Sequence, residues 1–232
     1  MLSRKDTLTI LTNNLHTKTP FIFTKFGDGE IACMNGEVGH NCDRHPYSEN
    51  LGVHLIDSFL YLTSEDYCYI AKWVDDEYKD ILRNKWPVEF DNWVEYDTML
   101  HVEGQLDGYI KGFMSRLKSD VRIKVFVGPE RLSGVNKLLD IDYHIIIPTI
   151  NAYSVCDKAY NMMESLAKNH PDVIFIFSSG MMAKVLISDI HKKYKKCTFI
   201  DMGSSFDPIF VGKTRLKQCE REELINFYKE ML

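Results

Sequence analysis

The stretch Phe21-Ile22-Phe23-Thr24-Lys25-Phe26-Gly27-Asp28-Gly29-Glu30 joins an apolar, β-prone run to two closely spaced carboxylates. The run over residues 21–27 predicts a buried strand that ends in glycine. Asp28 and Glu30 follow it, and two carboxylates are costly to bring together unless a proton, a cationic side chain or a metal ion compensates them. Hard cations such as Mg²⁺ take oxygen ligands from one or two carboxylates and from substrate phosphates. This strand end is therefore a candidate site for a divalent ion.

The same carboxylates also have a purely structural interpretation. Acidic side chains in the first turn of a helix are favoured by its positive end, so Asp28 and Glu30 can cap a helix over residues 31–35. Lys25 can in addition neutralise them without a metal ion. Spacing alone does not separate these interpretations.

Other apolar runs resemble the first one and predict further strands at residues 67–73, 123–128, 144–148, 173–178 and 198–202. Continuous apolar strands are typical of parallel sheets covered on both faces. Helical spacing of apolar residues is found at 51–62, 106–117, 153–166, 182–190 and 221–232. This alternation predicts an α/β, Rossmann-like fold with a mostly parallel sheet and helices on both faces. Residues 93–102 alternate weakly and predict an edge or antiparallel strand.

Length and composition favour one globular unit. The 232 residues are 45% hydrophobic, which suits a single domain over 1–232, with residues 118–122 as the place for a subdivision. The net charge of -5 argues against a nucleic-acid-binding protein that relies on a basic face. No apolar run approaches the ~18 residues of a membrane span, and no export signal is visible. Six cysteines without a CxxC pair suit a reducing compartment, so we expect a cytoplasmic protein.

The residues that follow the predicted strands are the next candidates, because ligands of open parallel sheets bind beyond the carboxyl ends of the strands. Ser179 and Gly180 precede a helix, where free backbone N–H groups can bind a phosphate. Gly128 follows another strand, and glycine lets the backbone approach a ligand closely. Asn151 can bind a base or sugar edge, with Tyr153 stacking.

The last strand leads to Ser204 and Asp207. For any one strand end, glycine, serine and asparagine are explained equally well as turn and cap residues. Their recurrence at successive strand ends favours a shared crevice.

Two further groups of residues are weaker candidates for the site. Cys33, His40, Cys42 and His45 are zinc-ligand types, but their spacing matches no common zinc pattern, which favours a polar loop over the mouth of the site. In that loop Arg44 and His45 are available to a phosphate or an acceptor. His101 and Glu103 follow an apolar run and are minor candidates for the crevice.

The segment Lys25-Phe26-Gly27-Asp28-Gly29-Glu30 resembles the Arg-Phe-Gly-Asp-Gly-Glu segment of GT-D-fold glycosyltransferases, a family with a DXE motif that was once a bacterial domain of unknown function. The resemblance continues in the same order over residues 20–210. It includes Val127-Gly128-Pro129-Glu130, Ile147-Pro148 with Asn151-Ala152-Tyr153, Ser179-Gly180 with Lys184-Val185-Leu186, and Ile200-Asp201-Met202-Gly203-Ser204. Two departures stand out. Lys25 replaces an arginine and its bidentate fork, and Ser178-Ser179-Gly180 differs from the Gly-Pro-Thr of some members.

The resemblance implies a metal-dependent transferase that moves a sugar from a nucleotide-diphosphate sugar, with a UDP-sugar expected, to a hydroxyl of a glycan acceptor. The implied ion is Mn²⁺ or Mg²⁺, and Asp28 and Glu30 map onto the DXE carboxylates. The expected nucleotide-binding residues are Lys25, Gly27, Gly128, Asn151, Tyr153, Ser179, Gly180 and Ser204. The expected catalytic residues are Asp28, Glu30 and Asp207, with Glu30 or Asp207 as the base. The C-terminal helix is the candidate surface for a homodimer.

Two other functions remain open at this stage. A methyltransferase that uses S-adenosylmethionine also places glycine and an acidic residue at strand ends, although no Gly-x-Gly follows the first strand here. A non-catalytic module that binds nucleotide sugars would share the fold, because one fold hosts many functions.

Overall fold

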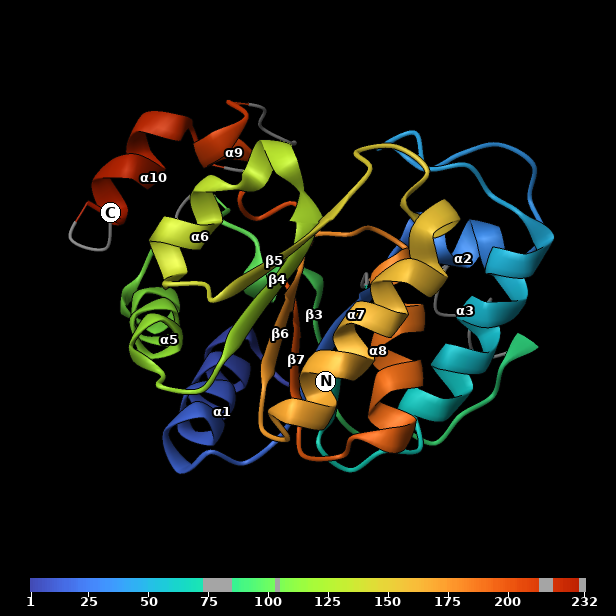
Figure 1. The fold of residues 1–232 in the computed structure, drawn as a ribbon, viewed down its shortest axis with the longest axis horizontal. Helices are drawn as coiled ribbons and strands as arrows, with labels where there is room; N and C mark the ends of the chain where they lie inside the picture. Colours follow the sequence, from blue (N-terminus) through green and yellow to red (C-terminus); the bar gives the residue numbers. More distant parts are fainter. Residues whose placement is uncertain (73–84, 103–104, 213–218, 230–232) are drawn as a thin grey trace.

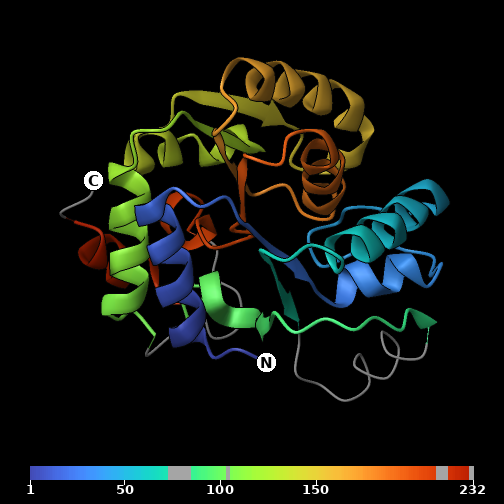
Figure 2. The same cartoon turned by 90° about the horizontal axis from the view of Figure 1, so that it is seen from below.

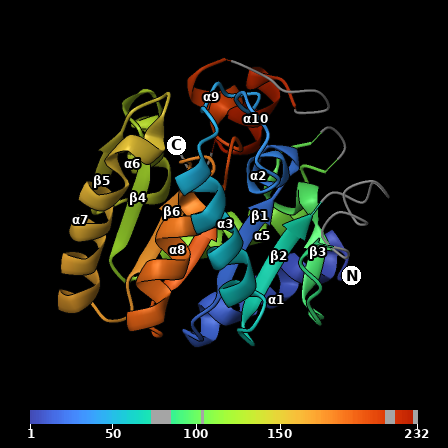
Figure 3. The same cartoon turned by 90° about the vertical axis from the view of Figure 1, so that its right-hand side faces the viewer.

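Seven parallel strands form one sheet in the computed structural model, which describes residues 1–72, 85–102, 105–212 and 219–229. The strand order is β3-β2-β1-β7-β6-β4-β5, and Figure 3 shows the sheet from β5 at one edge to β3 at the other. The strands are β1 Ile22–Phe26, β2 Cys68–Lys72, β3 Trp93–Glu95, β4 Lys124–Pro129, β5 Tyr143–Ile147, β6 Ile174–Phe177 and β7 Thr198–Asp201. The predicted α/β, Rossmann-like parallel sheet is confirmed.

Helices cover both faces of this sheet (Figures 1 and 2). One face carries α2 Asp28–Met34, α3 Glu49–Leu62, α7 Cys156–Asn169 and α8 Met182–Lys193. The other carries α1 Arg4–Thr17, α5 Gly108–Ser119 and α6 Gly134–Leu139, and α9 Asp207–Phe210 and α10 Arg221–Phe227 follow β7. Among the described residues, none of the helices combines the length and the apolar character that a bilayer crossing requires.

The central strands are mostly apolar because both of their faces are buried, whereas the edge strand β5 exposes Tyr143 and Ile146. Along β1, Ile22 and Phe26 belong to the core under α3 and α8. Phe23, which points to the opposite face, belongs to the core under α1 and α5. Side chains alternate between the two faces of a strand, so a strand between two helical layers needs apolar residues at every position.

Three elements differ from the sequence-based expectation. β3 is an edge strand, as one alternative predicted, but it pairs parallel to β2, so the antiparallel alternative is wrong. The helix expected over 31–35 begins earlier, at Asp28. The N-terminal segment, in which no structure was predicted, forms α1, where Ser3 accepts a hydrogen bond from the Asp6 N–H and Leu8, Leu11 and Leu15 are buried. Trp73, the end of the second predicted strand, and residues 230–232 of the predicted last helix lie outside the described residues, as does Glu103.

The C-terminal helix is linked to the end of β7 through a buried histidine. His101 lies 2.7 Å through Nδ1 from the backbone oxygen of Ser205, and 2.6 Å through Nε2 from the hydroxyl of Tyr228. A neutral imidazole has one donor and one acceptor nitrogen, so Nδ1–H donates to Ser205 and the Tyr228 hydroxyl donates to Nε2. His101 is therefore a bridge inside the protein, and it does not line the cavity described below.

This bridge predicts a pH-dependent stability. Burial lowers the pKa of His101 to about 4, although its hydrogen bond to Ser205 opposes this shift, and burial lowers the pKa of His191 to about 4 as well. Between pH 4 and 6.5 the unfolded chain binds protons at these imidazoles that the folded chain does not. Their stabilisation is therefore complete above pH 6.5 and is lost as the pH falls. We expect His101 alone to account for a loss of about 2 kcal/mol of unfolding free energy between pH 8 and 5.

Urea unfolding at several pH values measures this loss. The variant His101→Gln should retain only the part of the pH slope that comes from His191 and other groups. An unchanged slope in this variant would contradict the assignment.

Candidate functional site

A cavity of about 630 Å³ lies at the carboxyl ends of the strands. Its walls come from the residues that follow β1, β4, β5, β6 and β7, so one cleft collects several strand ends. The predicted site residues that line it are Lys25, Asp28, Glu30, Ser179, Gly180, Ser204 and Asp207. Lining residues that the sequence-based reasoning did not select include Tyr96, Arg131 and Lys184.

Four predicted residues do not line this cavity. Gly27 lies beside it, where an added Cβ would lie 2.8 Å from the Tyr96 hydroxyl oxygen. At Gly128 an added Cβ would meet the Phe126 ring at 2.5 Å, so this glycine is explained by packing. Asn151 has a left-handed backbone (φ 54°), and the Tyr153 hydroxyl lies 2.6 Å from His54 Nδ1. The nucleotide-binding roles assigned to these four residues stay predictions.

A buried lysine holds two carboxylates at the edge of the cavity. Lys184 Nζ lies 2.8 Å from Glu30 Oε1 and 2.9 Å from Asp201 Oδ2. It also donates a hydrogen bond of 3.2 Å to the Gly180 carbonyl. Burial acts to lower the pKa of Lys184, but Asp201 and Glu30 outweigh it and raise the pKa, so the ammonium is charged. Lys184, rather than the expected Lys25, therefore neutralises Glu30.

The remaining oxygens of these carboxylates are also bonded. The Gly27 N–H donates to Glu30 Oε2 at 3.0 Å, which closes a capping box at the start of α2. The Gly203 N–H donates to Asp201 Oδ1 at 3.0 Å. The structural interpretation of the acidic pair therefore holds for Glu30, whose two oxygens both have protein partners.

Asp28 differs from Glu30 because it is exposed, in the first turn of α2, and lines the cavity. Within the described ranges, no group of three or more His, Cys, Asp or Glu side chains is arranged to hold a metal ion. This also leaves the zinc interpretation of Cys33, His40, Cys42 and His45 without support. The donor set fits an ion that Asp28 shares with the oxygens of a ligand, rather than an ion enclosed by protein.

The turn after β6 is suited to an anion. Ser178 and Ser179 are buried, and neither hydroxyl has a hydrogen-bond partner. Gly180 has φ +60°, a conformation that favours glycine, and α8 begins two residues later. Two residues with unpartnered hydroxyls thus line the cavity just ahead of the N-terminus of a 12-residue helix.

Cationic groups lie on other walls of the same cavity. The side chain of Arg131, from the turn Glu130–Leu132, lies 3.7 Å from Asp207 Oδ1 and is 35% exposed. Lys25 donates a hydrogen bond of 3.4 Å to the Met202 carbonyl and lies over the Tyr96 ring, 5.7 Å from its centroid. His45 borders Gly180, and burial lowers its pKa, which favours the neutral ring.

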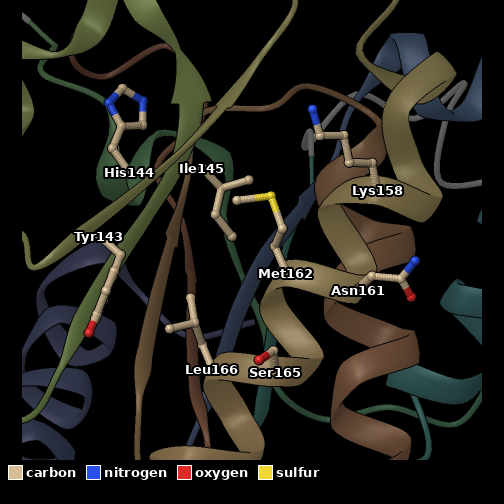
Figure 4. Close-up of a pocket in the computed structure, with 8 residues that line it drawn as sticks. All are labelled: Tyr143, His144, Ile145, Lys158, Asn161, Met162, Ser165 and Leu166. Atoms are coloured by element: carbon tan, nitrogen blue, oxygen red, sulfur yellow. The ribbon is translucent and has the colours of Figure 1, made fainter.

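A second hollow, of about 680 Å³, lies between β5 and α7 (Figure 4). Figure 4 shows the side chains of Ile145 and Met162 pointing toward each other, with Lys158 and Asn161 on the same helix as Met162. The residues that line it include no carboxylate and none of the predicted site residues. The cavity at the strand ends is therefore the candidate functional site.

Comparisons with known proteins bear on the fold. No family model and no curated protein matches the chain. Two solved structures match over 100% of this chain and 89% of theirs. One is a selenomethionine-substituted structure of domain of unknown function 1792, with a TM-score of 0.67 and 19% identity. The other, with a TM-score of 0.65 and 20% identity, is described as the highly conserved domain of unknown function 1792, which has a distinct glycosyltransferase fold. The chain therefore has this glycosyltransferase fold, as the GT-D resemblance in its sequence implied.

Proposed function

We propose that this protein is a glycosyltransferase that moves a sugar from a nucleotide-diphosphate sugar to a hydroxyl of a glycan acceptor. The observation that carries the proposal is the cavity at the strand ends. In it an anion-binding turn, two cationic side chains and an exposed carboxylate meet. The fold shared with a described glycosyltransferase fold supports the same conclusion. A cavity of about 630 Å³ is also of the size that small-molecule ligands occupy.

The diphosphate is assigned to the turn Ser178–Gly180 and to Arg131. The unpartnered hydroxyls of Ser178 and Ser179 can donate to phosphate oxygens, and the helix N-terminus favours their charge. Arg131 presents a planar fork that matches phosphate geometry. Lys25 and Ser204 extend this polar wall. A UDP-sugar is the proposed donor.

A divalent ion, Mn²⁺ or Mg²⁺, is proposed to bind Asp28 together with the donor diphosphate. When bound, such an ion offsets the negative charge that develops on a leaving diphosphate. Glu30, the second expected ligand, bonds to Lys184 and to the Gly27 N–H instead.

Asp207 is the proposed base. In a direct displacement the acceptor oxygen forms a bond to the anomeric carbon, the bond from that carbon to the diphosphate breaks, and a carboxylate takes the hydroxyl proton. Both oxygens of Glu30 are already engaged by protein donors, the Lys184 ammonium and the Gly27 N–H, which leaves Asp207 as the carboxylate proposed for this role. Asp207 lines the same cavity and lies at the start of α9.

Arg131→Met is expected to weaken UDP binding by roughly 10- to 100-fold, because a hydrogen bond to a charged group contributes about 1.5–3 kcal/mol. Titration calorimetry with UDP measures the change. Arg116→Met is the matched control, since Arg116 lies on α5 and pairs with Asp120 rather than lining the cavity. Equal affinities of the wild type and Arg131→Met would remove Arg131 from the diphosphate site.

A panel of nucleotide sugars, tested with Mn²⁺ and glycan acceptors, tests the function itself. The expected result is release of nucleoside diphosphate together with a glycosylated product. Tight binding of S-adenosylmethionine, with no binding of UDP or GDP, would instead establish the methyltransferase alternative. Nucleotide-sugar binding without turnover over a broad range of acceptors would establish a binding module.

A further inference from the structure

The ammonium of Lys184 is saturated by protein oxygens. Its three oxygen neighbours are Glu30 Oε1 at 2.8 Å, Asp201 Oδ2 at 2.9 Å and the Gly180 carbonyl at 3.2 Å. An ammonium group has three N–H donors and no acceptor. Lys184 therefore borders the cavity with its ammonium surrounded by protein oxygens, through two ion pairs and one hydrogen bond.

The three oxygens around Lys184 form the kind of donor set that a divalent ion uses. Two belong to carboxylates from different elements, α2 and β7, and the third is a backbone carbonyl. Asp201 is fully buried and Glu30 nearly so. Two buried carboxylates that contact the same atom require a cation between them, and Mg²⁺ and Ca²⁺ accept the same oxygen types.

We propose that Lys184 is a resident cation that takes the place of a divalent ion between Glu30 and Asp201. Its three bonds join the start of α2, the end of β7 and the turn Ser178–Gly180. Lys184 is thus a positioning residue for the phosphate-binding turn, and Glu30 is its charged anchor rather than a metal ligand. The link to donor binding rests on the proposed function, but the cation replacement itself is measurable without a donor.

The experiment titrates Mn²⁺ into nucleotide-free protein and follows free Mn²⁺ by electron paramagnetic resonance. Lys184→Ala leaves two uncompensated carboxylates and space between them, so we expect it to bind Mn²⁺ at least tenfold more tightly than the wild type. Added Mn²⁺ should also raise the unfolding temperature of this variant more than that of the wild type, because a ligand of the folded state stabilises it.

Lys124→Ala is the matched control. Lys124 is also a buried lysine, but its Nζ donates to the backbone carbonyls of Lys118 and Asp120. Its removal should lower stability without any gain in Mn²⁺ affinity. A folded Lys184→Ala protein with wild-type Mn²⁺ affinity would overturn the proposal, as would an equal gain in Lys124→Ala.

Glu30→Gln provides an independent test if Lys184→Ala does not fold. The proposal expects its Mn²⁺ affinity to stay within about twofold of the wild type, because Glu30 is not a ligand, and a tenfold loss would refute it. Asp28→Asn separates this proposal from the proposed function. If Asp28→Asn loses Mn²⁺ binding and Glu30→Gln does not, Asp28 is the ligand, which supports both the cation replacement and the proposed function. A strong loss of Mn²⁺ affinity in both Asp28→Asn and Glu30→Gln would refute the proposal for Lys184 but not the proposed function.

Discussion

Asp207→Asn is expected to lower kcat for sugar transfer by about 10²- to 10⁴-fold, the usual contribution of a positioned general base. Asparagine keeps the shape of the side chain but cannot take the acceptor proton. Asp207 is nearly buried, and the ion pair with Arg131 orients its carboxylate within the cavity. Because the diphosphate is assigned to other residues, KM for the donor should change much less than kcat.

Steady-state assays of diphosphate release, at several donor concentrations, measure this split. Asp57→Asn, an exposed carboxylate on α3, is the control and should keep wild-type kinetics. A large rise in donor KM at constant kcat would place Asp207 in donor binding rather than in proton transfer.

Asp28→Asn is expected to lower kcat/KM by on the order of 10²- to 10³-fold at a fixed Mn²⁺ concentration, similar to the loss of one charge-stabilising group elsewhere. The neutral amide is a poorer ligand for a hard cation than the carboxylate. Raising the Mn²⁺ concentration should recover part of the activity, because the ion keeps its contacts with the diphosphate.

The measurement is activity as a function of Mn²⁺ concentration in the wild type and in Asp28→Asn. The midpoint should move to higher Mn²⁺ in the variant. Identical midpoints would show that Asp28 does not contact the ion, and full activity of both proteins without any divalent ion would end the metal proposal.

The strands were predictable because each has apolar residues on both faces. A run such as residues 173–178 leaves no other way to bury its side chains, and β6 lies within it. The edge strand β3 was harder to predict, since it is only three residues long and two of its residues are only partly buried. The helix α1 was harder to predict because its many threonines and asparagines weaken the helical pattern of Leu8, Leu11 and Leu15. These leucines are buried because α1 packs against α5.

The candidate site was partly predictable for a topological reason. Strand ends of a parallel sheet meet at one edge, so Asp28, Ser179 and Asp207 were brought together by sheet order alone. The side chains of Lys184 and Asp201 meet only through the packing of α8 against the end of β7, and no spacing in the sequence encodes that pairing. The one visible signal was a lysine within the apolar run of α8, where Val185 and Leu186 are also buried.

Gly128, Asn151 and Tyr153, which do not line the cavity, have a related position in the fold. Each follows or ends a strand near the β5 edge, where the chain turns away and the residues are used in packing or in surface contacts. Position after a strand fixes the neighbourhood of a residue, but the direction of its side chain depends on the turn.

The His101 bridge links the C-terminal helix to the backbone beside the candidate site. A chain that stopped before Tyr228 would lose the hydroxyl that satisfies an imidazole nitrogen deep in the interior, next to the backbone that leads into Asp207. Truncation or tagging near the carboxyl terminus is therefore expected to disturb the backbone beside the candidate site.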